Sequence, residues 1–274
     1  MERAISKSKF TILGAKGFIG SHLLEKLQDQ GAKCLNPDRD DPALYGQNLG
    51  HVIYCIGLTA NFRERPFDTV RAHVLYLLKL LEKARFDSFL YLSSTRLYLK
   101  AHQGDEDADV LVNSNDTEDL YNLSKLMGES LCFACNQKNV RVARLSNVVG
   151  KKPGSSDFLS SIIRDAVEQG KVVLKSGLAS EKDYVSLSDV VAVLPKIAIS
   201  GRHRLYNVAS GQNISHQGLL NEIQKITGCA LEVTEEAKDT VFPKISIKRL
   251  QMEFAFSPVL LIPSLRELIP HDVM

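Results

Sequence analysis

Three glycines at three-residue intervals close the first apolar run of this chain and constrain its fold more than any other feature. The run is Phe10 to Leu13, and Gly14, Gly17 and Gly20 follow it directly. Apolar residues then recur at helical spacing over residues 17–30. A buried parallel strand that enters a helix through a tight turn has this pattern. We therefore expect a strand–turn–helix unit at the start of an α/β sheet.

Strand-like and helical segments alternate along the next part of the chain. Apolar runs predict strands at residues 33–36, 51–56, 89–92 and 140–145, and helical spacing predicts helices at 68–84 and 120–133. This alternation is typical of a doubly wound parallel sheet of the Rossmann type, with helices on both faces. We therefore predict an α/β fold in which residues 1–150 form an NAD(P)-binding domain.

The pattern loosens after residue 150. Helices are predicted at 158–168, 187–199, 216–226 and 245–254, and short strands at 172–174, 205–208 and 231–234. We expect residues 151–274 to form a smaller C-terminal α/β substrate lobe, some of whose pieces return to the sheet.

The composition argues against several classes of partner. Lys plus Arg number 34 and Asp plus Glu number 32, so the chain lacks the basic excess of a nucleic-acid-binding protein. No apolar run reaches the ~18 residues of a membrane span, and the first residues do not resemble a signal peptide. We expect a cytoplasmic protein with neither a nucleic-acid nor a membrane partner.

The five cysteines are scattered rather than grouped. Cys132 and Cys135 form a lone Cys-x-x-Cys pair, and no second pair of Cys or His residues would complete a metal site. The spacing gives no disulfide framework either. We expect reduced thiols and no bound metal.

The glycine turn suits a dinucleotide for physical reasons. Glycine allows a tight turn, lets a pyrophosphate approach the backbone, and lets the helix pack closely on the sheet. The N-terminus of the following helix offers N–H groups and the positive end of the helix dipole to phosphates. The spacing Gly-x-x-Gly-x-x-Gly differs from the commoner Gly-x-Gly-x-x-Gly. Its place between a strand and an amphipathic helix favours a dinucleotide site.

Asp38 follows Gly14 by 24 residues and is the candidate ligand for the adenosine ribose. A carboxylate at that position favours NAD, because it would repel a 2′-phosphate. Lys16 and Arg39 favour NADP, since both cations could bind such a phosphate. NAD is the prediction, and NADP stays open as the alternative.

Tyr121 and Lys125 are a candidate catalytic pair. They stand four residues apart in a predicted helix, so their side chains share one face. A free tyrosine has a pKa near ~10, and a neighbouring cation stabilises the phenolate and lowers that pKa. Tyr121 would then exchange a proton as hydride leaves or reaches the substrate carbon. Ser94, at the end of the fourth predicted strand, is the candidate hydroxyl that holds the substrate oxygen.

These motifs resemble those of the extended short-chain dehydrogenase/reductases, and specifically the NAD-dependent epimerase/dehydratase family acting on nucleotide sugars. The resemblance covers nearly the whole chain. The similar segments are 14–20, 52–57, 89–98, 121–125, 144–150 and 182–185. The family's catalytic hydroxyl lies four residues before a tyrosine, which selects Ser94 before Tyr98. A family asparagine contacts the sugar nucleotide, which selects Asn147, and Lys182 stands in place of a family arginine.

The resemblance implies a full set of site residues, with catalysis assigned to Ser94, Tyr121 and Lys125. The implied cofactor contacts are Gly14, Lys16, Gly17, Phe18, Ile19, Gly20, Asp38, Arg39, Ile56, Gly57, Leu58, His73, Leu92, Tyr121, Lys125 and Val148. The implied substrate contacts are Ser94, Thr95, Tyr121, Asn147, Val173 and Lys182. Side chains of residues 58–61 and 172–184 are expected to select the sugar and the nucleotide.

Two departures from the family pattern bear on the reaction. His73 stands where the family usually has asparagine, in the helix beside the active site. The family's sugar dehydratases follow the catalytic hydroxyl with Asp-Glu, whereas Thr95 and Arg96 follow Ser94 here. No acid pair is available at that point to expel water, so the sequence argues against a 4,6-dehydratase.

The resemblance therefore implies a nucleotide-sugar oxidoreductase of the epimerase type. NAD would take hydride from a sugar carbon, expected to be C4, and return it to the other face. The nearest alternative is an NAD(P)H-dependent nucleotide-4-ketosugar reductase. A non-catalytic dinucleotide sensor is a third reading, which the retention of Tyr121 and Lys125 disfavours. Family members dimerise through helices that flank the sheet, so a homodimer is expected.

Overall fold

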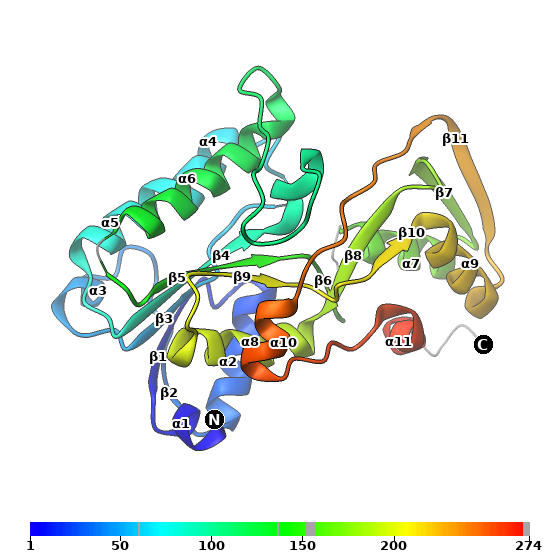
Figure 1. The fold of residues 1–274 in the computed structure, drawn as a ribbon. Helices are drawn as coiled ribbons and strands as arrows, with labels where there is room; N and C mark the ends of the chain where they lie inside the picture. Colours follow the sequence, from blue (N-terminus) through cyan, green and yellow to red (C-terminus); the bar gives the residue numbers. More distant parts are fainter. Residues whose placement is uncertain (60, 136, 152–156, 271–274) are drawn as a thin grey trace.

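The computed structural model describes residues 1–59, 61–135, 137–151 and 157–270, and its central feature is one parallel sheet (Figure 1). The sheet has six strands in the order β2-β1-β3-β4-β5-β9, and every neighbouring pair is parallel. The strands are β1 (Lys9–Leu13), β2 (Lys33–Leu35), β3 (His51–Tyr54), β4 (Ser88–Ser94), β5 (Val140–Leu145) and β9 (Leu205–Val208). The strand order reverses at β1, as in doubly wound Rossmann folds, which confirms the predicted fold class.

Helices cover both faces of this sheet. One face carries α2 (Phe18–Asp29) and α8 (Leu187–Ser200), and the other carries α4 (Pro66–Val70), α5 (Tyr76–Lys83) and α6 (Leu120–Ala134) (Figure 1). Successive strand residues point to opposite faces of a sheet. Ile53 therefore belongs to the apolar cluster under α2 and α8, while Val52 and Tyr54 belong to the cluster on the other face. Both faces need apolar side chains, which is why these strands appear in the sequence as continuous apolar runs.

The helix predicted at residues 68–84 is divided into three pieces. A π-helical segment, Arg71–Leu75, lies between α4 and α5. The wider turn removes some main-chain carbonyls from the regular hydrogen-bond pattern of the helix. Tyr54 and Tyr91, on neighbouring strands, donate their hydroxyls to two carbonyls of this segment, the second being that of His73. Tyrosine hydroxyls from the sheet thus supply hydrogen bonds to main-chain carbonyls of the irregular turn.

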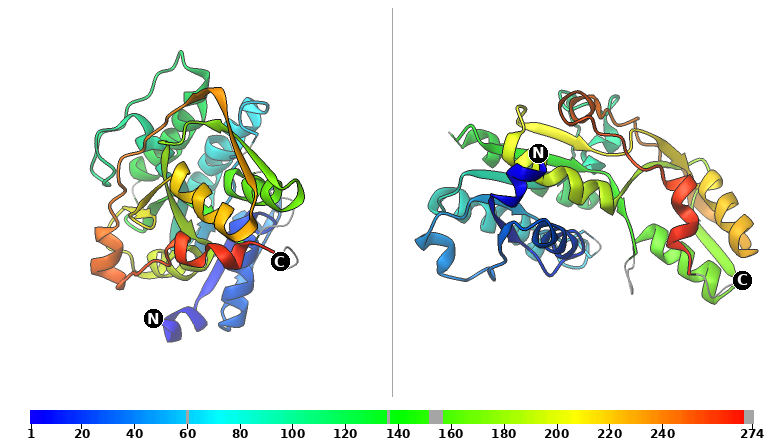
Figure 2. Two further views of the ribbon diagram at one scale, coloured as in Figure 1. Left: turned by 90° about the vertical axis from the view of Figure 1, so that its right-hand side faces the viewer. Right: turned by 90° about the horizontal axis from the view of Figure 1, so that it is seen from below.

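A smaller lobe lies at one end of the main sheet (Figure 2). It contains a three-stranded sheet of β10 (Asn213–Ser215), β8 (Glu181–Ser186) and β6 (Asn147–Val149), and a parallel pair of β11 (Ala230–Lys238) and β7 (Lys171–Ser176). Its helices are α7 (Phe158–Glu168), α9 (His216–Thr227) and α11 (Leu261–Leu268), which share an apolar core with these strands. Between these elements in the chain, α8 and β9 return to the main sheet.

Two further parts of the sequence-based prediction differ from the structure. The helix predicted at 245–254 is α10 (Lys248–Phe254), so it begins later. Ile245 forms a β-bridge with Gly104, and Ser246 donates its N–H to the carbonyl of the same glycine at 2.8 Å. The second difference is the three-stranded sheet, because the sequence predicts none of its strands.

Short helical segments complete the described residues. They are α1 (Glu2–Ser6), α3 (Ala43–Gly46) and two 3₁₀ segments, Thr95–Lys100 and Thr117–Asp119. None of the helices in the described part of the chain combines the length and the apolar character that crossing a bilayer requires.

Candidate active site

The turn after β1 is as tight as the glycine pattern predicts. Gly14 has a φ of +88°, and a Cβ built on it would lie 3.0 Å from the main chain just after β3. A Cβ on Gly20 would lie 2.3 Å from the Gly14 carbonyl oxygen, so α2 packs on the turn at a distance that only glycine permits. Gly17 caps α2, whose first residues are Phe18 and Ile19. This is the geometry of a phosphate-binding turn at a helix N-terminus.

Lys16 and Asp38 form an ion pair with an Nζ–Oδ1 distance of 2.8 Å, and both side chains are exposed. The hydrogen bond and the charge of Lys16 lower the pKa of Asp38. Arg39 is exposed beside them, and its carbonyl accepts the Tyr76 hydroxyl. A cavity of about 380 Å³ opens here, lined by Cys34, Leu35, Asn36, Pro37, Asp38, Asp41, Ala43, Leu44, Gln47 and Leu49. Asp38, which is predicted to favour NAD, therefore lines the cavity while paired with Lys16, one of the two cations predicted to favour NADP.

The Ser94 hydroxyl lies close enough to Tyr121 to lower the pKa of the phenol, although the two residues come from β4 and α6. Ser94 ends β4, and its Oγ accepts the Arg96 N–H at 3.1 Å, which caps the following 3₁₀ turn. Tyr121 is buried, and the Thr59 side chain also lowers the pKa of its phenol. Burial raises the pKa of Tyr121, while the Ser94 and Thr59 hydroxyls and the charge of Arg96 oppose this rise.

Lys125 lies one turn further along α6 and is buried. Its Nζ donates to the Leu92 carbonyl at 2.8 Å and stands 6.0 Å from the centroid of the Tyr121 ring. Burial lowers the pKa of Lys125 to about 7, and the charge of Glu129 opposes this effect. The sequence predicts that Lys125 lowers the pKa of Tyr121. In the structure burial dominates and the pKa is raised, and the cation that opposes this rise is Arg96.

His73 connects the end of β3 to α6. Its Nε2 accepts the Leu58 N–H at 3.3 Å, and its Nδ1 lies 2.8 Å from Ser124 Oγ. The Ser124 hydroxyl donates to the Tyr121 carbonyl at 2.8 Å, so Nδ1 of His73 must carry the proton in the first contact. Burial and a neighbouring ammonium lower the pKa of His73 to about 2. A Cβ on Gly57 would lie 3.5 Å from Nε2, so the neutral ring lies close to the cofactor candidates after β3.

A buried ion pair lies behind Lys125. Arg144 donates from Nε and Nη2 to the two carboxylate oxygens of Glu129, at 2.9 and 2.7 Å. Its Nη1 donates to the Tyr98 hydroxyl at 2.8 Å, and that hydroxyl donates to Asn207 Oδ1 at 2.9 Å. Removing one partner of a buried ion pair costs about 3–5 kcal/mol, because the other charge stays buried and unpaired. The pair therefore fixes the part of α6 that carries Lys125.

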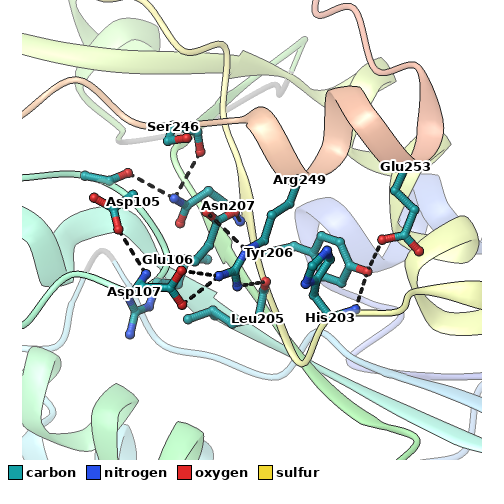
Figure 3. Close-up of polar contacts among 12 residues, drawn as sticks. Asp105, Glu106, Asp107, His203, Leu205, Tyr206, Asn207, Ser246, Arg249 and Glu253 are labelled. Atoms are coloured by element: carbon teal, nitrogen blue, oxygen red, sulfur yellow. Dashed lines mark hydrogen bonds and ion pairs between the residues drawn. The ribbon is translucent and has the colours of Figure 1, made fainter.

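The same network continues to α10, as Figure 3 shows. The Asn207 main-chain N–H donates to Glu106 Oε1 at 3.0 Å, and its side-chain amide donates to the Ser246 carbonyl at 3.1 Å. Arg249 pairs with both Glu106 and Asp107. The loop that follows the Ser94-capped turn is thus fastened to β9 and to α10.

The other residues predicted for the site are spread over two regions. Ile56 and Thr95 are buried. In β6, Asn147 donates its side-chain amide to the Asp183 carbonyl at 2.8 Å, and Val148 packs against the main apolar core. Lys182 is half-buried on β8, with its Nζ 4.7 Å from the centroid of the Phe158 ring. Val173 is 43% exposed on β7, and no described contact joins it to Tyr121 or Ser94.

Sequence reasoning gave no role to Phe62, which packs on Tyr121 with 5.4 Å between ring centroids. The guanidinium carbons of Arg63 and Arg96 lie 4.5 and 5.5 Å from the centroid of the Phe62 ring. The only sequence signal is that Phe62 follows the segment 58–61, expected to select the substrate. Among the described residues, no group of three or more His, Cys, Asp or Glu side chains is arranged to hold a metal ion.

Comparisons with known proteins show the family and the fold of this chain. The sequence profile of the NAD dependent epimerase/dehydratase family matches residues 10–209. A curated relative, dTDP-4-dehydro-6-deoxy-D-allose reductase of Streptomyces bikiniensis, is 22% identical over 79% of this chain and 80% of its own length. Both matches extend over most of the chain.

Solved structures show the same fold. MoeE5 in complex with UDP-glucose and NAD is 20% identical with a TM-score of 0.78, over 95% of this chain and 97% of that chain. UDP-glucose 4-epimerase of Thermotoga maritima with UDP-glucose is 17% identical with a TM-score of 0.77, again over 95% and 97%. Other similar structures hold NADPH or UDP-glucuronic acid.

The matched segment runs from the second residue of β1 to just past β9. It therefore includes the glycine turn, the end of β4 and the first turns of α6, and it spans well over half of the chain. This chain belongs to the NAD dependent epimerase/dehydratase family.

Proposed function

We propose that this protein is an NAD-dependent nucleotide-sugar oxidoreductase of the epimerase type, acting at C4 of the sugar. The observation that carries the proposal is the position of two groups around Tyr121: the Ser94 hydroxyl lowers the pKa of the phenol, and the ammonium of Lys125 lies 6.0 Å from the centroid of its ring. The carboxyl ends of parallel strands meet at one edge of a sheet. The end of β4 with Ser94 and the Gly14 turn after β1 therefore lie on the same edge.

Proton transfer at the substrate hydroxyl is assigned to Tyr121. Ser94 donates a hydrogen bond to the same oxygen and orients it, while Lys125 supplies positive charge near the phenol. NAD, when bound, supplies the hydride acceptor that the protein's own side chains lack. On the return step Tyr121 gives the proton back to the oxygen. Inversion at C4 follows when the ketosugar has turned in the pocket before that step.

The residues around the turn fit a dinucleotide. The contacts of Gly14 and Gly20 leave main chain, rather than side chain, where a pyrophosphate would lie. The cavity at Asp38 is assigned to the adenosine ribose, with the carboxylate as its ligand. We propose NAD as the cofactor on this ground.

Tyr121→Phe tests the mechanism. The variant should lose turnover of a nucleotide sugar, followed by NMR of the sugar protons, while its dissociation constant for NAD stays within about threefold of the wild type. Tyr206→Phe is the matched control, because its hydroxyl bonds Glu253 at the far side of β9. A Tyr121→Phe protein with full activity would contradict the assigned role.

A nucleotide-4-ketosugar reductase is the second candidate. It is favoured by the exposed cations Lys16 and Arg39, which lie where an NADP phosphate would bind. An epimerase returns its cofactor unchanged, whereas a reductase consumes one equivalent of NADPH for each turnover. Denaturing freshly purified protein and identifying the released dinucleotide separates the two. Retained NAD supports the epimerase, and an empty protein that prefers NADPH supports the reductase.

The remaining proposals concern organisation. We propose that residues 1–150 bind the cofactor and residues 151–274 form the substrate lobe, including the contacts predicted for Asn147, Val173 and Lys182. We also propose a cytoplasmic homodimer. Light scattering on the purified protein measures its mass, and a monomer at micromolar concentration would contradict the dimer.

A further inference from the structure

Arg96 has hydrogen-bond donors that its neighbours leave unused. Its Nη2 lies 3.3 Å from Glu118 Oε2, but that carboxylate already forms a two-point contact with Arg63. The Nε of Arg96 is buried and has no hydrogen-bond partner among the described residues. A guanidinium carries five N–H donors in a fixed fork, and a buried donor without a partner is unfavourable. Because the side chain of Arg96 is 28% exposed, a further acceptor can reach its outer N–H groups, although not the buried Nε.

The position of Arg96 places these donors beside the candidate catalytic groups. Its main-chain N–H donates to Ser94 Oγ at 3.1 Å. Its guanidinium carbon lies 5.5 Å from the centroid of the Phe62 ring, which packs on Tyr121. The charge of Arg96 also acts on the phenol, where it opposes the rise that burial causes in the pKa of Tyr121. Arg96 therefore belongs to the same group of contacting residues as Ser94, Phe62 and Tyr121.

The surroundings of Arg96 keep an excess of positive charge. Arg63 and Arg96 share the single carboxylate of Glu118. Lys182 adds a further cation, and both its own burial and the charge of Arg96 lower its pKa. A partly buried site with surplus positive charge attracts an anion.

We propose that Arg96 binds a carboxylate carried by the sugar ring, so that the substrate is a nucleotide-activated uronic acid. This inference rests on the proposed function, namely reaction at C4. A planar carboxylate accepts two parallel N–H bonds from a guanidinium fork. In a uronic acid the carboxylate is C6, attached to C5, and C5 is bonded directly to C4. The diphosphate, the other anion of the substrate, is attached at C1, across the ring from the reacting carbon.

The test measures binding to the cofactor-loaded protein by isothermal titration calorimetry. The probes are matched uronic acid and neutral sugars on UDP, dTDP and GDP, together with the free nucleoside diphosphates. The wild type should bind the acidic sugar of its own nucleotide at least about tenfold more tightly than the neutral one. Arg96→Gln should weaken the acidic sugar about 10- to 100-fold and leave the neutral sugar within about threefold, as expected for loss of a charged hydrogen bond.

Two further variants separate charge from geometry. Arg96→Lys keeps the positive charge but loses the fork, so it should recover only part of the affinity for the acidic sugar. Arg63→Gln is the matched control, because Arg63 lies on the same Phe62 ring and contacts the same Glu118 but is 57% exposed. It should leave binding of the neutral sugar unchanged and weaken binding of the acidic sugar less than Arg96→Gln does, because Glu118 then has only Arg96 to pair with.

Each other outcome overturns the inference in a recognisable way. If Arg96→Gln weakened binding of the acidic sugar, the neutral sugar and the free nucleoside diphosphate equally, Arg96 would be a ligand of the diphosphate instead. Equal binding of acidic and neutral sugars by the wild type would show that the protein does not recognise a carboxylate on the sugar, while leaving the proposed function intact. Failure of every nucleotide sugar to bind would overturn the proposed function, and this inference with it. A loss confined to the acidic sugar cannot come from misfolding, because the same variant binds the neutral sugar normally.

Discussion

His73 Nδ1 lies 2.8 Å from Ser124 Oγ, and this contact joins the π-helical segment to the helix that carries Tyr121. The ring accepts from Leu58 at its other nitrogen, so both nitrogens are used in the neutral form. Protonation would remove the acceptor at Nε2, and burial lowers the pKa to about 2. His73 should stay neutral, with the proton on Nδ1, throughout pH 5–8. Side-chain ¹⁵N shifts, assigned with His73→Asn, would show a protonated ring if this is wrong.

Loss of the same ring should destabilise the protein. His73→Ala leaves a cavity and unsatisfied hydrogen-bond groups on Leu58 and Ser124, at a cost of about 2–4 kcal/mol in the free energy of unfolding. Asparagine both donates and accepts, so His73→Asn should cost less than half as much. Urea denaturation measures both values. Equal costs for the two variants would show that the asparagine amide replaces neither hydrogen bond of the ring.

Lys125 should make stability depend on pH in a predictable direction. Its pKa in the folded protein is about 7, against an ordinary value of 10.5. Between these values the unfolded chain holds more protons than the folded one, so the free energy of unfolding rises with pH in this window. The unfavourable contribution of Lys125 is complete below about pH 7 and disappears toward pH 10.

Lys125→Met removes this group, so it should stabilise the protein most at pH 7 and progressively less at pH 8 and 9. Urea denaturation of wild type and variant at matched cofactor content gives the difference at each pH. Other groups titrate in both proteins and largely cancel from this difference. A constant difference across the range would contradict the depressed pKa.

Gly20→Ala should weaken the cofactor site. In a helix this change is ordinarily favourable by about 1 kcal/mol, but the new Cβ would meet the Gly14 carbonyl oxygen at 2.3 Å. The clash should destabilise the protein by about 1–3 kcal/mol and lower dinucleotide affinity, measured by fluorescence titration. Gly46→Ala is the control, since a Cβ there has no atom within 4 Å among the described residues. If the two variants had similar stability and similar dinucleotide affinity, α2 would not pack closely on the turn.

Asp38→Ala should shift cofactor preference toward NADP. The substitution removes the carboxylate that would repel a 2′-phosphate and releases Lys16 from its ion pair. The ratio of NADP to NAD affinity should rise by at least about tenfold, in line with one charge-assisted hydrogen bond. Asp40→Ala is the control, since Asp40 is exposed in the same loop. An unchanged ratio of NADP to NAD affinity in Asp38→Ala would show that Asp38 does not bind the adenosine ribose.

The parallel sheet could be predicted because its strands are buried on both faces. The strand at 140–145 and the helix at 158–168 have the predicted limits. Continuous apolar runs and helical spacing record such burial locally. β8 (Glu181–Ser186) could not be found this way, since it contains the buried Asp183. That carboxylate accepts hydrogen bonds from Ser210 and Gln212, and only the folded chain brings these residues to it.

The candidate active site also contains some residues that local sequence patterns reveal and others that they do not. The spacing of Tyr121 and Lys125 on one helix is a local property, so the sequence reveals it. Arg96 acts on Tyr121 only because β4 and α6 are adjacent in space. The π-helical turn at His73 depends on two tyrosines from separate strands, and no helical pattern records their hydroxyls. These contacts depend on distant parts of the chain, and the sequence periodicities therefore miss them.

The position of β9 at the edge of the main sheet has a consequence for how the chain folds. Val142 of β5 pairs with Leu205 of β9, and the strands β6, β7 and β8 are synthesised between them. When β5 has left the ribosome, its outer edge is still unpaired, and the sheet face later covered by α8 is still exposed. Closing such a long-range parallel pairing is slow, because the intervening loop must first be ordered. The sheet can be completed only after β6, β7 and β8 have been made, so its last pairing depends on a strand that the ribosome adds after a large part of the smaller lobe.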